Sequence, residues 1–371
     1  MERKLASIRI IDNIEPISGA DAIEVATIGG WKVVVKKGEF KIGQLAIYFE
    51  IDSWIPHELA PFLSKGSIPR EYNGIKGERL RTIRLRGQVS QGLLLPTEAY
   101  EIELETQNSD DVYYVPRTSP FEEGEDLTEL LFIQKWEAPV SANMAGKVKG
   151  SFPSYIRKTD QERAQNLLKE IFEENKETEY EVTIKLDGSS MTVYHVVNND
   201  TDILSERVID QGVCSRNLNL KLDQEGNTFV DVAKNSGLLG ALFQLDKSIA
   251  VQGELMGPGI QHNREGLKEH EFYVYDIWDI NNQCYFPPYD RNEILQDLAN
   301  HGARFKHVPI LFNIARIKDM DHLGIHNIEG LLDFAKGKSI NNPVREGLVF
   351  KSTNGDFSFK AISNEFLLGE K

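Results

Sequence analysis

Short apolar runs separated by turn residues fill the first 97 residues and exclude a fold built from long helices for this part of the chain. Glycine, proline, aspartate or Lys-Gly pairs stand between the runs. Runs of this length and spacing are typical of strands in a small barrel or sandwich. We therefore predict an N-terminal OB-like β-barrel. The runs are Ile23–Ile28, Trp31–Val35, Leu45–Ile51, Leu80–Leu85 and Gly92–Leu95.

An acidic segment follows this region. Residues 98–137 contain 12 aspartate and glutamate residues against only Arg117 and Lys135, and they include Pro116 and Pro120. Prolines and a high density of charges of one sign are typical of a linker or an excursion. We expect a short helix in it at Leu127–Phe132. We predict a domain boundary near residue 140, so that residues 1–140 form the OB-like domain and residues 141–371 form a second domain.

The second domain mixes strands and helices. Thr159-Asp160-Gln161-Glu162 matches a capping box ahead of periodic apolar residues, which predicts a helix at this point. Further helices are expected at Phe229–Lys247, Arg291–Asn300 and Ile328–Lys336. Strands are expected at Glu181–Lys185, Met191–Val197, Ile249–Glu254, Phe272–Ile277, Gly347–Lys351 and Phe357–Ile362. This pattern predicts an α+β domain of antiparallel sheets with flanking helices.

The net charge of −15 is unusual for a protein that handles nucleic acid, but its distribution is uneven. Residues 1–97 contain 14 lysine and arginine residues against 11 acids, a net charge of +3. A local basic surface therefore remains compatible with the composition. Because the sequence has no long apolar stretch, no signal-peptide core and no disulfide or zinc pattern around Cys214 and Cys284, we expect a cytoplasmic protein with no membrane segment.

The segment Lys185-Leu186-Asp187-Gly188 is the first candidate for chemistry. A lysine at the end of an apolar strand beside a tight turn has its amine fixed on rigid backbone. Gly188 permits a positive φ in this turn, and Asp187 can orient the turn or a ligand hydroxyl. A lysine becomes a nucleophile once it loses its proton, which burial or a neighbouring cation favours. The alternative is a hairpin with a surface lysine, and this motif alone does not decide between them.

Further polar motifs follow in a fixed order. They are Ser215-Arg216-Asn217, Val251-Gln252-Gly253-Glu254-Leu255, Phe272–Ile277, Arg345-Glu346-Gly347-Leu348-Val349-Phe350-Lys351 and Phe359-Lys360-Ala361. Taken with Lys185, this series resembles the ordered motifs of the covalent nucleotidyltransferases, a superfamily of DNA ligases, RNA ligases and capping enzymes. The resemblance covers roughly residues 153–362. It implies an adenylyltransferase domain at residues 141–371.

The resemblance implies a role for each matched residue. Lys185 would attack the α-phosphate of ATP and form lysyl-AMP, with Ile184, Asp187 and Gly188 completing its motif at the nucleotide. The remaining expectations are Arg216 near the ribose and the incoming strand end, Glu254 at the ribose, Tyr275 and Asp276 at the adenine, Glu346 beside the metal, and Lys351 and Lys360 on the α-phosphate. Mg²⁺ or Mn²⁺ would neutralise the triphosphate, with Glu346 and Asp276 as candidate ligands acting through water.

A narrower group fits the order of the domains. Only 11 residues follow Lys360, so we expect the accessory OB domain at the N-terminus, as in RNA ligases of the Deinococcus type. That resemblance implies an ATP-dependent ligase that seals 3′-OH and 5′-phosphate ends at breaks in RNA-containing duplexes. We expect it to act as a monomer. One departure concerns the last motif, where the family often has two lysines separated by one residue and this chain has Ser358 at the first place.

The OB-like domain has basic residues of its own. We expect Arg79, Arg81, Arg84 and Arg86 to lie on one alternating strand and to place their cations on one exposed face, which suits contact with phosphates. The alternative is a solvated strand face without a ligand.

Three other functions remain compatible with the sequence. A guanylyltransferase of the capping type shares the lysine chemistry, and the motifs do not exclude sealing of DNA. A non-catalytic OB-type RNA-binding protein with a decayed transferase domain is the rival from another class. Labelling with ATP separates these functions, because a protein that only binds RNA forms no covalent adenylate.

Overall fold

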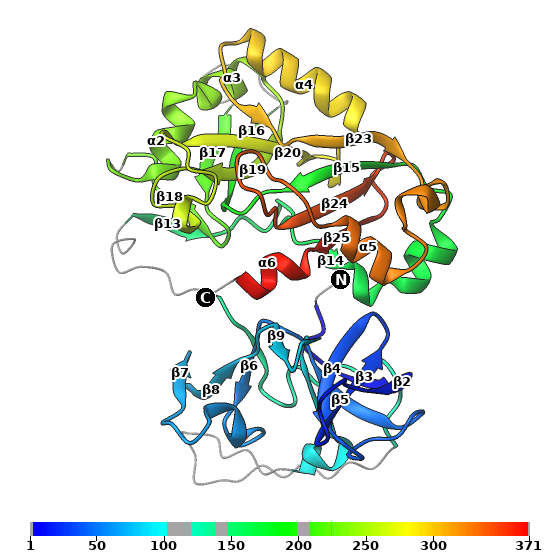
Figure 1. The fold of residues 1–371 in the computed structure, drawn as a ribbon. Coiled ribbons are helices and arrows are strands. Elements are labelled where there is room, and N and C mark those ends of the chain that lie inside the picture. The colour runs from blue at the N-terminus through cyan, green and yellow to red at the C-terminus, as the bar shows by residue number, and fades with distance from the viewer. Residues whose placement is uncertain (1–2, 102–119, 138–146, 199–207, 224, 370–371) are drawn as a thin grey trace. The chain divides into compact units, whose positions relative to one another are not determined.

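A computed structural model describes residues 3–101, 120–137, 147–198, 208–223 and 225–369 (Figure 1). Residues 102–119 of the acidic segment therefore lie outside the described residues. The chain divides into two compact units, one formed by Met1–Pro139 with Leu367–Lys371 and the other by Val140–Phe366.

The N-terminal unit consists of short strands in small sheets. Its strands are β1 (Ala6–Ile10), β2 (Asn13–Pro16), β3 (Ile23–Ile28), β4 (Trp31–Lys36), β5 (Leu45–Phe49), β6 (Ser53–Pro56), β7 (Arg70–Tyr72), β8 (Ile75–Arg79), β9 (Ile83–Leu85), β10 (Gln88–Ser90), β11 (Leu93–Pro96) and β12 (Gln134–Lys135), with 3-10 helices η1 (Pro61–Ser64) and η2 (Thr97–Glu101). Strands pair in the orders β1-β5-β11, β2-β3-β4, β12-β6-β8-β7 and β10-β9. Ile8, Ile47 and Phe49 lie in its buried core.

Two expected elements of this unit are wrong. The run Leu80–Leu85 is a strand only from Ile83, because the backbone of Leu80 instead exchanges hydrogen bonds with Asp52 and Ser53. The expected helix at Leu127–Phe132 is a set of hydrogen-bonded turns, in which Leu127 and Leu131 are buried. Tertiary packing of these leucines, rather than helical propensity, fixes the local backbone.

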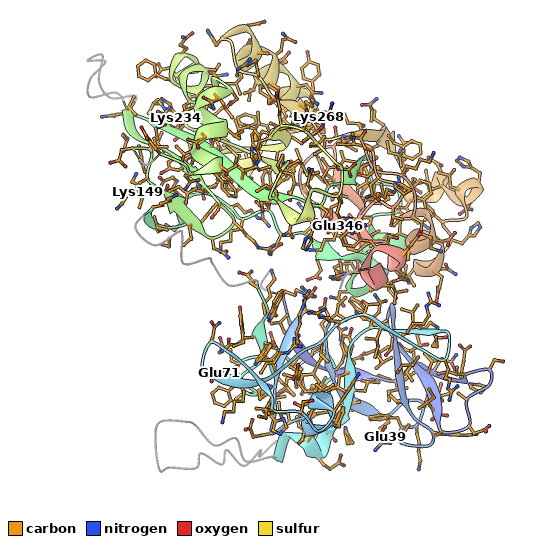
Figure 2. All side chains as sticks on the ribbon, turned by 60° about the vertical axis from the view of Figure 1, so that its left-hand side comes forward. Glu39, Glu71, Lys149, Lys234, Lys268 and Glu346 are labelled. Atoms are coloured by element: carbon orange, nitrogen blue, oxygen red, sulfur yellow. The ribbon has the colours of Figure 1, made fainter. Side chains whose placement is uncertain are left out.

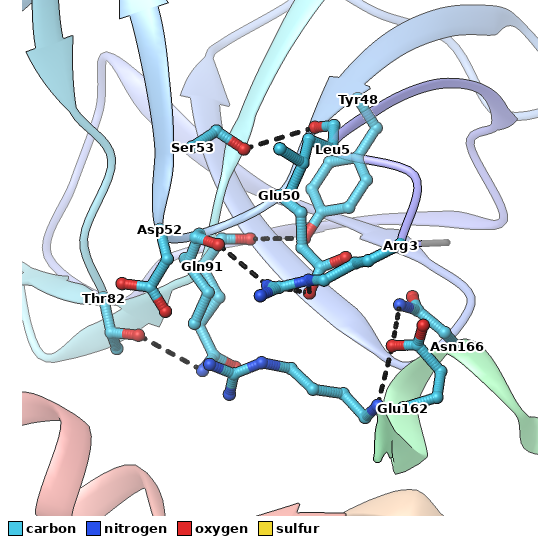
Figure 3. A network of polar contacts seen from close by, with 12 residues as sticks. Arg3, Leu5, Tyr48, Glu50, Asp52, Ser53, Thr82, Gln91, Glu162 and Asn166 are labelled. Atoms are coloured by element: carbon cyan, nitrogen blue, oxygen red, sulfur yellow. Dashed lines mark hydrogen bonds and ion pairs between the residues drawn. The ribbon is translucent and has the colours of Figure 1, made fainter. Parts of the chain in front are cut away.

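A polar network inside the barrel ties its strands together (Figure 3). The Arg3 Nε atom donates to the buried carboxylate of Glu50 at 2.9 Å. The Tyr48 hydroxyl donates to the Gln91 carbonyl at 3.1 Å, and the Gln91 amide nitrogen donates to the Thr82 hydroxyl at 3.4 Å. Buried polar groups are stable only when they are paired in this way. These bonds fix the segment that leads into and out of the β9–β10 hairpin.

The second unit contains two sheets. Its strands are β13 (Val148–Ser151), β14 (Glu162–Arg163), β15 (Tyr180–Lys185), β16 (Ser189–Val197), β17 (Val208–Cys214), β18 (Leu218–Leu220), β19 (Ile249–Met256), β20 (Glu271–Asp279), β21 (Cys284–Tyr285), β22 (Lys306–His307), β23 (Ile310–Ala315), β24 (Gly347–Ser352) and β25 (Ser358–Ile362). Among the described residues, one sheet has the order β13-β18-β17-β16-β19-β20-β21 with β22 beside β20, and the other has the order β14-β25-β24-β15-β23. Most pairs are antiparallel, and β14–β25 and β20–β22 are parallel.

Helices cover both sheets. They are α2 (Thr228–Asn235), α3 (Leu238–Leu245), α4 (Pro288–Asn300), α5 (Ile328–Phe334) and α6 (Asn364–Gly369), with 3-10 helices η4 (Ala164–Asn166), η6 (Gln261–Asn263), η7 (Ile317–Asp319) and η8 (Asp321–Leu323), and a π-helical turn η5 (Glu170–Glu174). Side chains of α2, α3 and α4 pack in one core with β16, β19 and β20. Leu331 and Leu332 of α5 share a second core with Phe350 and Phe359, whose rings stack at 4.7 Å.

Two helix expectations need correction. The single helix expected at Phe229–Lys247 is two helices, because Gly237 between them has a φ of 75°. The capping-box helix at Thr159–Glu162 does not form. Glu162 instead pairs in parallel with Phe359 of β25, and its side chain accepts hydrogen bonds from the Arg163 backbone at 2.7 Å and from Asn166 at 3.0 Å.

Candidate active site

Lys185 and Glu346 meet at the end of two paired strands. Lys185 is the last residue of β15, and its register partner is Gly347, the first residue of β24. Glu346 directly precedes that strand, and Figure 2 labels it there. The Lys185 Nζ atom lies 2.8 Å from each carboxylate oxygen of Glu346. With side chains 27% and 14% exposed, both groups can be reached by a ligand.

The carboxylates around Lys185 favour its protonated form. Burial is the largest single influence and lowers the pKa of Lys185, but the charges of Glu346, Glu254 and Asp187 together outweigh it. The pKa of Lys185 is therefore raised above its ordinary value. Because only a neutral amine is a nucleophile, this arrangement disfavours nucleophilic attack by Lys185 while the carboxylates remain charged.

Gly188 brings the Lys185 turn against β19. Its backbone N–H donates to the Glu254 carboxylate at 3.1 Å. A Cβ atom on Gly188 would lie 2.5 Å from the Leu255 carbonyl oxygen and 2.6 Å from the Met256 sulfur. Gly188 does not use the positive φ that a glycine permits. This position needs glycine because two backbones approach closely there, and the approach links the two sheets.

Glu254 is a strongly perturbed carboxyl. Its pKa is raised to about 8, chiefly by burial and in part by the Glu346 charge, while Lys185 and the Gly188 N–H oppose the rise. Asp187, on the other side of the turn, lies 3.8 Å from the Arg264 guanidinium. Strong perturbation of several groups in one place is typical of a functional site.

Tyr275, Asp276 and Lys351 form a second group that also joins the two sheets. The Lys351 Nζ atom of β24 lies 2.7 Å from the Asp276 carboxylate on β20 and 4.9 Å from the centre of the Tyr275 ring. Burial lowers the pKa of Lys351, and Asp276 opposes that change. The Tyr275 hydroxyl is 3.0 Å from the Thr159 hydroxyl and 3.5 Å from that of Ser190. The tyrosine ring is therefore held in one orientation.

A buried ion pair that the sequence reasoning missed supports this second group. Arg291 of α4 donates to both oxygens of Glu181 on β15, at 3.0 and 2.7 Å, and both side chains are at most 3% exposed. Arg291 also donates to the Tyr275 carbonyl at 3.2 Å, and Lys351 contacts the same carbonyl at 3.3 Å. Glu181, a charge inside the apolar strand Tyr180–Lys185, is the signal that could have pointed to a buried partner.

The remaining predicted residues lie on neighbouring elements. The Arg216 guanidinium binds Asp160 at 2.9 Å, next to the Thr159 that contacts Tyr275. Lys360 stands on β25 opposite Val349 of β24. Ser358, at the place of the missing lysine, is the register partner of Lys351. Ile184 is held through its backbone N–H, which donates to Pro309 at 2.9 Å.

The four arginines of the barrel do not share one strand, so that expectation is wrong. Arg79 ends β8 and is engaged inside the unit, where it pairs with Asp52 at 3.2 Å through Nε and stacks over the Trp136 ring at 4.1 Å. Arg84 lies on β9, Arg86 lies in the turn after it, and Arg81 precedes β9. The turn at Asp52 and Leu80 separates Arg79 from the other three.

Within the described part of the chain, no group of three or more histidine, cysteine, aspartate and glutamate side chains is placed to hold a metal ion directly. Glu346 and Asp276 each face a lysine instead. Their donor chemistry fits a hard cation held through water and through ligand phosphates, which is how proteins commonly bind Mg²⁺.

The lysine among carboxylates and the two antiparallel sheets joined around it define a nucleotidyltransferase domain, and a barrel of the OB type precedes it. A family model described as RNA ligase matches residues 178–362, and a model of an OB-fold domain matches residues 5–97. This confirms the predicted OB domain and nucleotidyltransferase domain.

Solved structures give the same result over the whole chain. A Naegleria gruberi RNA ligase mutant with AMP and Mn is 43% identical, with a TM-score of 0.83 and 99% of both chains covered. The Naegleria gruberi RNA ligase with PPi is 44% identical, with a TM-score of 0.81, 99% of this chain and 98% of that chain covered. The chain belongs to the RNA ligase family, as its motifs predicted.

A search of curated proteins finds no match. No helix in the described residues is long and apolar enough to cross a membrane.

Proposed function

We propose that this RNA ligase uses ATP with Mg²⁺ or Mn²⁺ to join 3′-OH and 5′-phosphate ends at nicks in RNA-containing duplexes, through a lysyl-AMP on Lys185. The observation that carries the proposal is the position of Lys185. Its amine is fixed at a strand end, reachable from solvent and surrounded by Glu346, Glu254 and Asp187.

In the first step, Lys185 Nζ attacks the α-phosphate of ATP. A nitrogen–phosphorus bond forms, the bond to the β-phosphate bridging oxygen breaks, and pyrophosphate leaves. The amine must lose a proton, and in the free enzyme Glu346 is the group that touches it. Lys351 and Lys360 are proposed to face the α-phosphate, where a cation stabilises developing charge.

The adenosine is proposed to lie between the Lys185 turn and β20. Tyr275 offers a ring whose orientation is fixed by Thr159 and Ser190. Glu254 beside Gly188 would bind the ribose hydroxyls, and Ile184, Gly188 and Asp276 would complete the nucleotide contacts. A bound divalent cation would neutralise the triphosphate, with Glu346 and Asp276 holding it through water.

Two further steps complete the ligation. AMP passes from Lys185 to the 5′-phosphate of the RNA, forming a pyrophosphate linkage and releasing the lysine. The 3′-OH then attacks that phosphate, a phosphodiester forms and AMP leaves. Arg216, whose side chain is 48% exposed and lies 2.9 Å from Asp160, is proposed to meet the incoming strand end.

The relatives support this proposal. Structures of the Naegleria gruberi ligase carry ATP and Mn, AMP and Mn, or PPi. Their mutants include a lysine replacement and an aspartate replacement two positions further on, the same spacing as Lys185 and Asp187.

The test is labelling with α-labelled ATP or GTP and Mg²⁺ or Mn²⁺. Wild type should retain label from ATP, Lys185→Ala should retain none, and Lys234→Ala on the surface of α2 should label like wild type. Label from GTP alone would indicate a guanylyltransferase, and no label in folded wild type would indicate a non-catalytic RNA-binding protein. Sealing assays on nicked duplexes with RNA or DNA on either side, compared with single-stranded RNA, then test the nick specificity.

A further inference from the structure

The β9–β10 hairpin of the N-terminal unit combines positive charge with exposed apolar side chains. Residues 80–97 contain three arginines and no acidic residue. All three residues of β9 are exposed, including Ile83 at 47% and Leu85 at 38%. Apolar side chains exposed beside cations on a projecting element are typical of a binding surface.

The two kinds of side chain lie on opposite faces of the hairpin. Ile83 and Leu85 pair with Ser90 and Gln88 on one face, whereas Arg84 pairs with Val89 on the other. The turn Arg86-Gly87 has positive φ at both residues, 48° and 86°, which is the geometry of a tight two-residue hairpin turn. The hairpin therefore presents Arg84 on one face, Ile83 and Leu85 on the opposite face, and Arg86 in the turn at its tip.

The hairpin is rigidly attached at its base. The Val34 N–H of β4 donates to the Ser90 hydroxyl at 2.9 Å, and the Gln91 N–H donates to the Lys32 carbonyl at 2.8 Å. The Tyr48 hydroxyl donates a hydrogen bond to the Gln91 carbonyl, and the Gln91 side-chain amide donates one to the Thr82 hydroxyl (Figure 3). At the tip, Arg84 donates to the Gly87 carbonyl at 2.7 Å, which orders its guanidinium. An element ordered in this way loses little conformational entropy when it binds.

The arginines of the hairpin are available for an anionic ligand. None of Arg81, Arg84 and Arg86 forms an ion pair with a carboxylate of the described residues, whereas Arg79 is already engaged by Asp52. Arginine at a surface of this kind suits phosphate groups, which it binds through paired N–H donors.

We propose that the β9–β10 hairpin is the RNA-duplex contact of this ligase. Arg84 and Arg86, with Arg81 beside them, bind backbone phosphates, and Ile83 and Leu85 rest on the sugars and base edges of the wide, shallow minor groove of A-form RNA. Arg79 has a structural role instead. This inference rests on the duplex substrate proposed above, and it assigns the recognition of that duplex to one element of the OB domain.

The experiment measures binding of a fluorescent nicked RNA duplex to the full-length protein without ATP, over a series of salt concentrations. Arg84→Ala/Arg86→Ala should weaken binding by roughly tenfold and reduce the slope of log Kd against log salt by about 1 to 2, because each lost phosphate contact contributes about 0.7–0.9 to that slope. Arg84→Lys/Arg86→Lys should retain most of the slope. Ile83→Ser/Leu85→Ser should weaken binding without changing the slope.

Lys36→Ala/Lys37→Ala is the matched control, since it removes two exposed charges from the same unit and should bind like wild type. All variants should form lysyl-AMP at the wild-type rate and keep the wild-type circular dichroism spectrum and thermal unfolding, which shows that both units are folded. Wild-type affinity and salt slope in Arg84→Ala/Arg86→Ala and in Ile83→Ser/Leu85→Ser would overturn the inference and point to a protein partner for this surface. If the hairpin variants lose duplex binding but wild type seals no nick, the hairpin assignment stands and only the nick-sealing proposal fails.

Discussion

The Lys185 amine lies 2.8 Å from the Glu346 carboxylate, although 161 residues separate the two in sequence. The contact exists because Lys185 ends β15 opposite the start of β24, directly after Glu346. It favours the protonated form of Lys185. The adenylation proposed for Lys185 therefore has to begin with separation or neutralisation of this pair.

The pH dependence of adenylation should reveal the pair. Because Glu346 raises the pKa of Lys185, the rate of lysyl-AMP formation should increase with pH until the amine is neutral. In Glu346→Gln the pKa of Lys185 falls, so the profile should shift to lower pH even if the maximal rate also drops. Single-turnover labelling with ATP across a pH series measures both the pH profile and the maximal rate. Glu58→Gln, at an exposed carboxylate, is the control, and equal profiles for Glu346→Gln and wild type would contradict the prediction.

Gly188→Ala should disable the enzyme without unfolding it. The new Cβ would lie 2.5 Å from the Leu255 carbonyl and would push the Lys185 turn away from Glu254. A displacement of about 1 Å in a reacting group costs roughly 100-fold in rate. Gly240→Ala is a matched control, because a Cβ there meets nothing within 4 Å and alanine favours the helix. Labelling rates and circular dichroism spectra of the two variants are compared with those of wild type. Near-normal labelling of Gly188→Ala would refute the prediction.

Removing one half of the buried Glu181–Arg291 pair should destabilise the second unit. Arg291→Met leaves the Glu181 charge buried and unpaired, which typically costs about 3–5 kcal/mol. Glu181→Leu/Arg291→Met should recover much of that loss, because no isolated charge remains. Urea unfolding of Arg291→Met, Glu181→Leu and the double variant measures the coupling free energy between the two side chains. Additive effects of the two substitutions would show that the groups do not act as a pair.

Glu254 should make stability depend on pH. Its pKa is raised on folding to about 8, so between the ordinary carboxyl pKa and pH 8 the unfolded chain loses a proton that the native state keeps. The free energy of unfolding should accordingly fall as the pH rises through this window. Urea unfolding at pH 5, 6.5 and 8 should show a smaller decline for Glu254→Gln than for wild type, while Glu58→Gln should keep the wild-type decline. An unchanged decline in Glu254→Gln would mean that another group titrates.

The sequence by itself determined most strands of the second unit, the order of the domains and the family, and it predicted the residues that would carry the chemistry. Apolar runs with flanking turn residues revealed β15, β19 and β24, because alternation and turn chemistry are local properties. The ordered motifs identified Lys185, Glu254 and Glu346 as one constellation. The same local reasoning failed at Thr159–Glu162, where a good capping box forms no helix.

Tertiary structure alone decided which partner each of these groups has. Glu162 pairs with β25, Gly188 is required by the approach of Leu255 rather than by its own φ, and Arg79 is removed from the basic surface by Asp52. The Arg291–Glu181 pair joins residues 110 positions apart, so no local pattern connects them. Contacts of this kind depend on strand register and on burial, which exist only once the two sheets have come together.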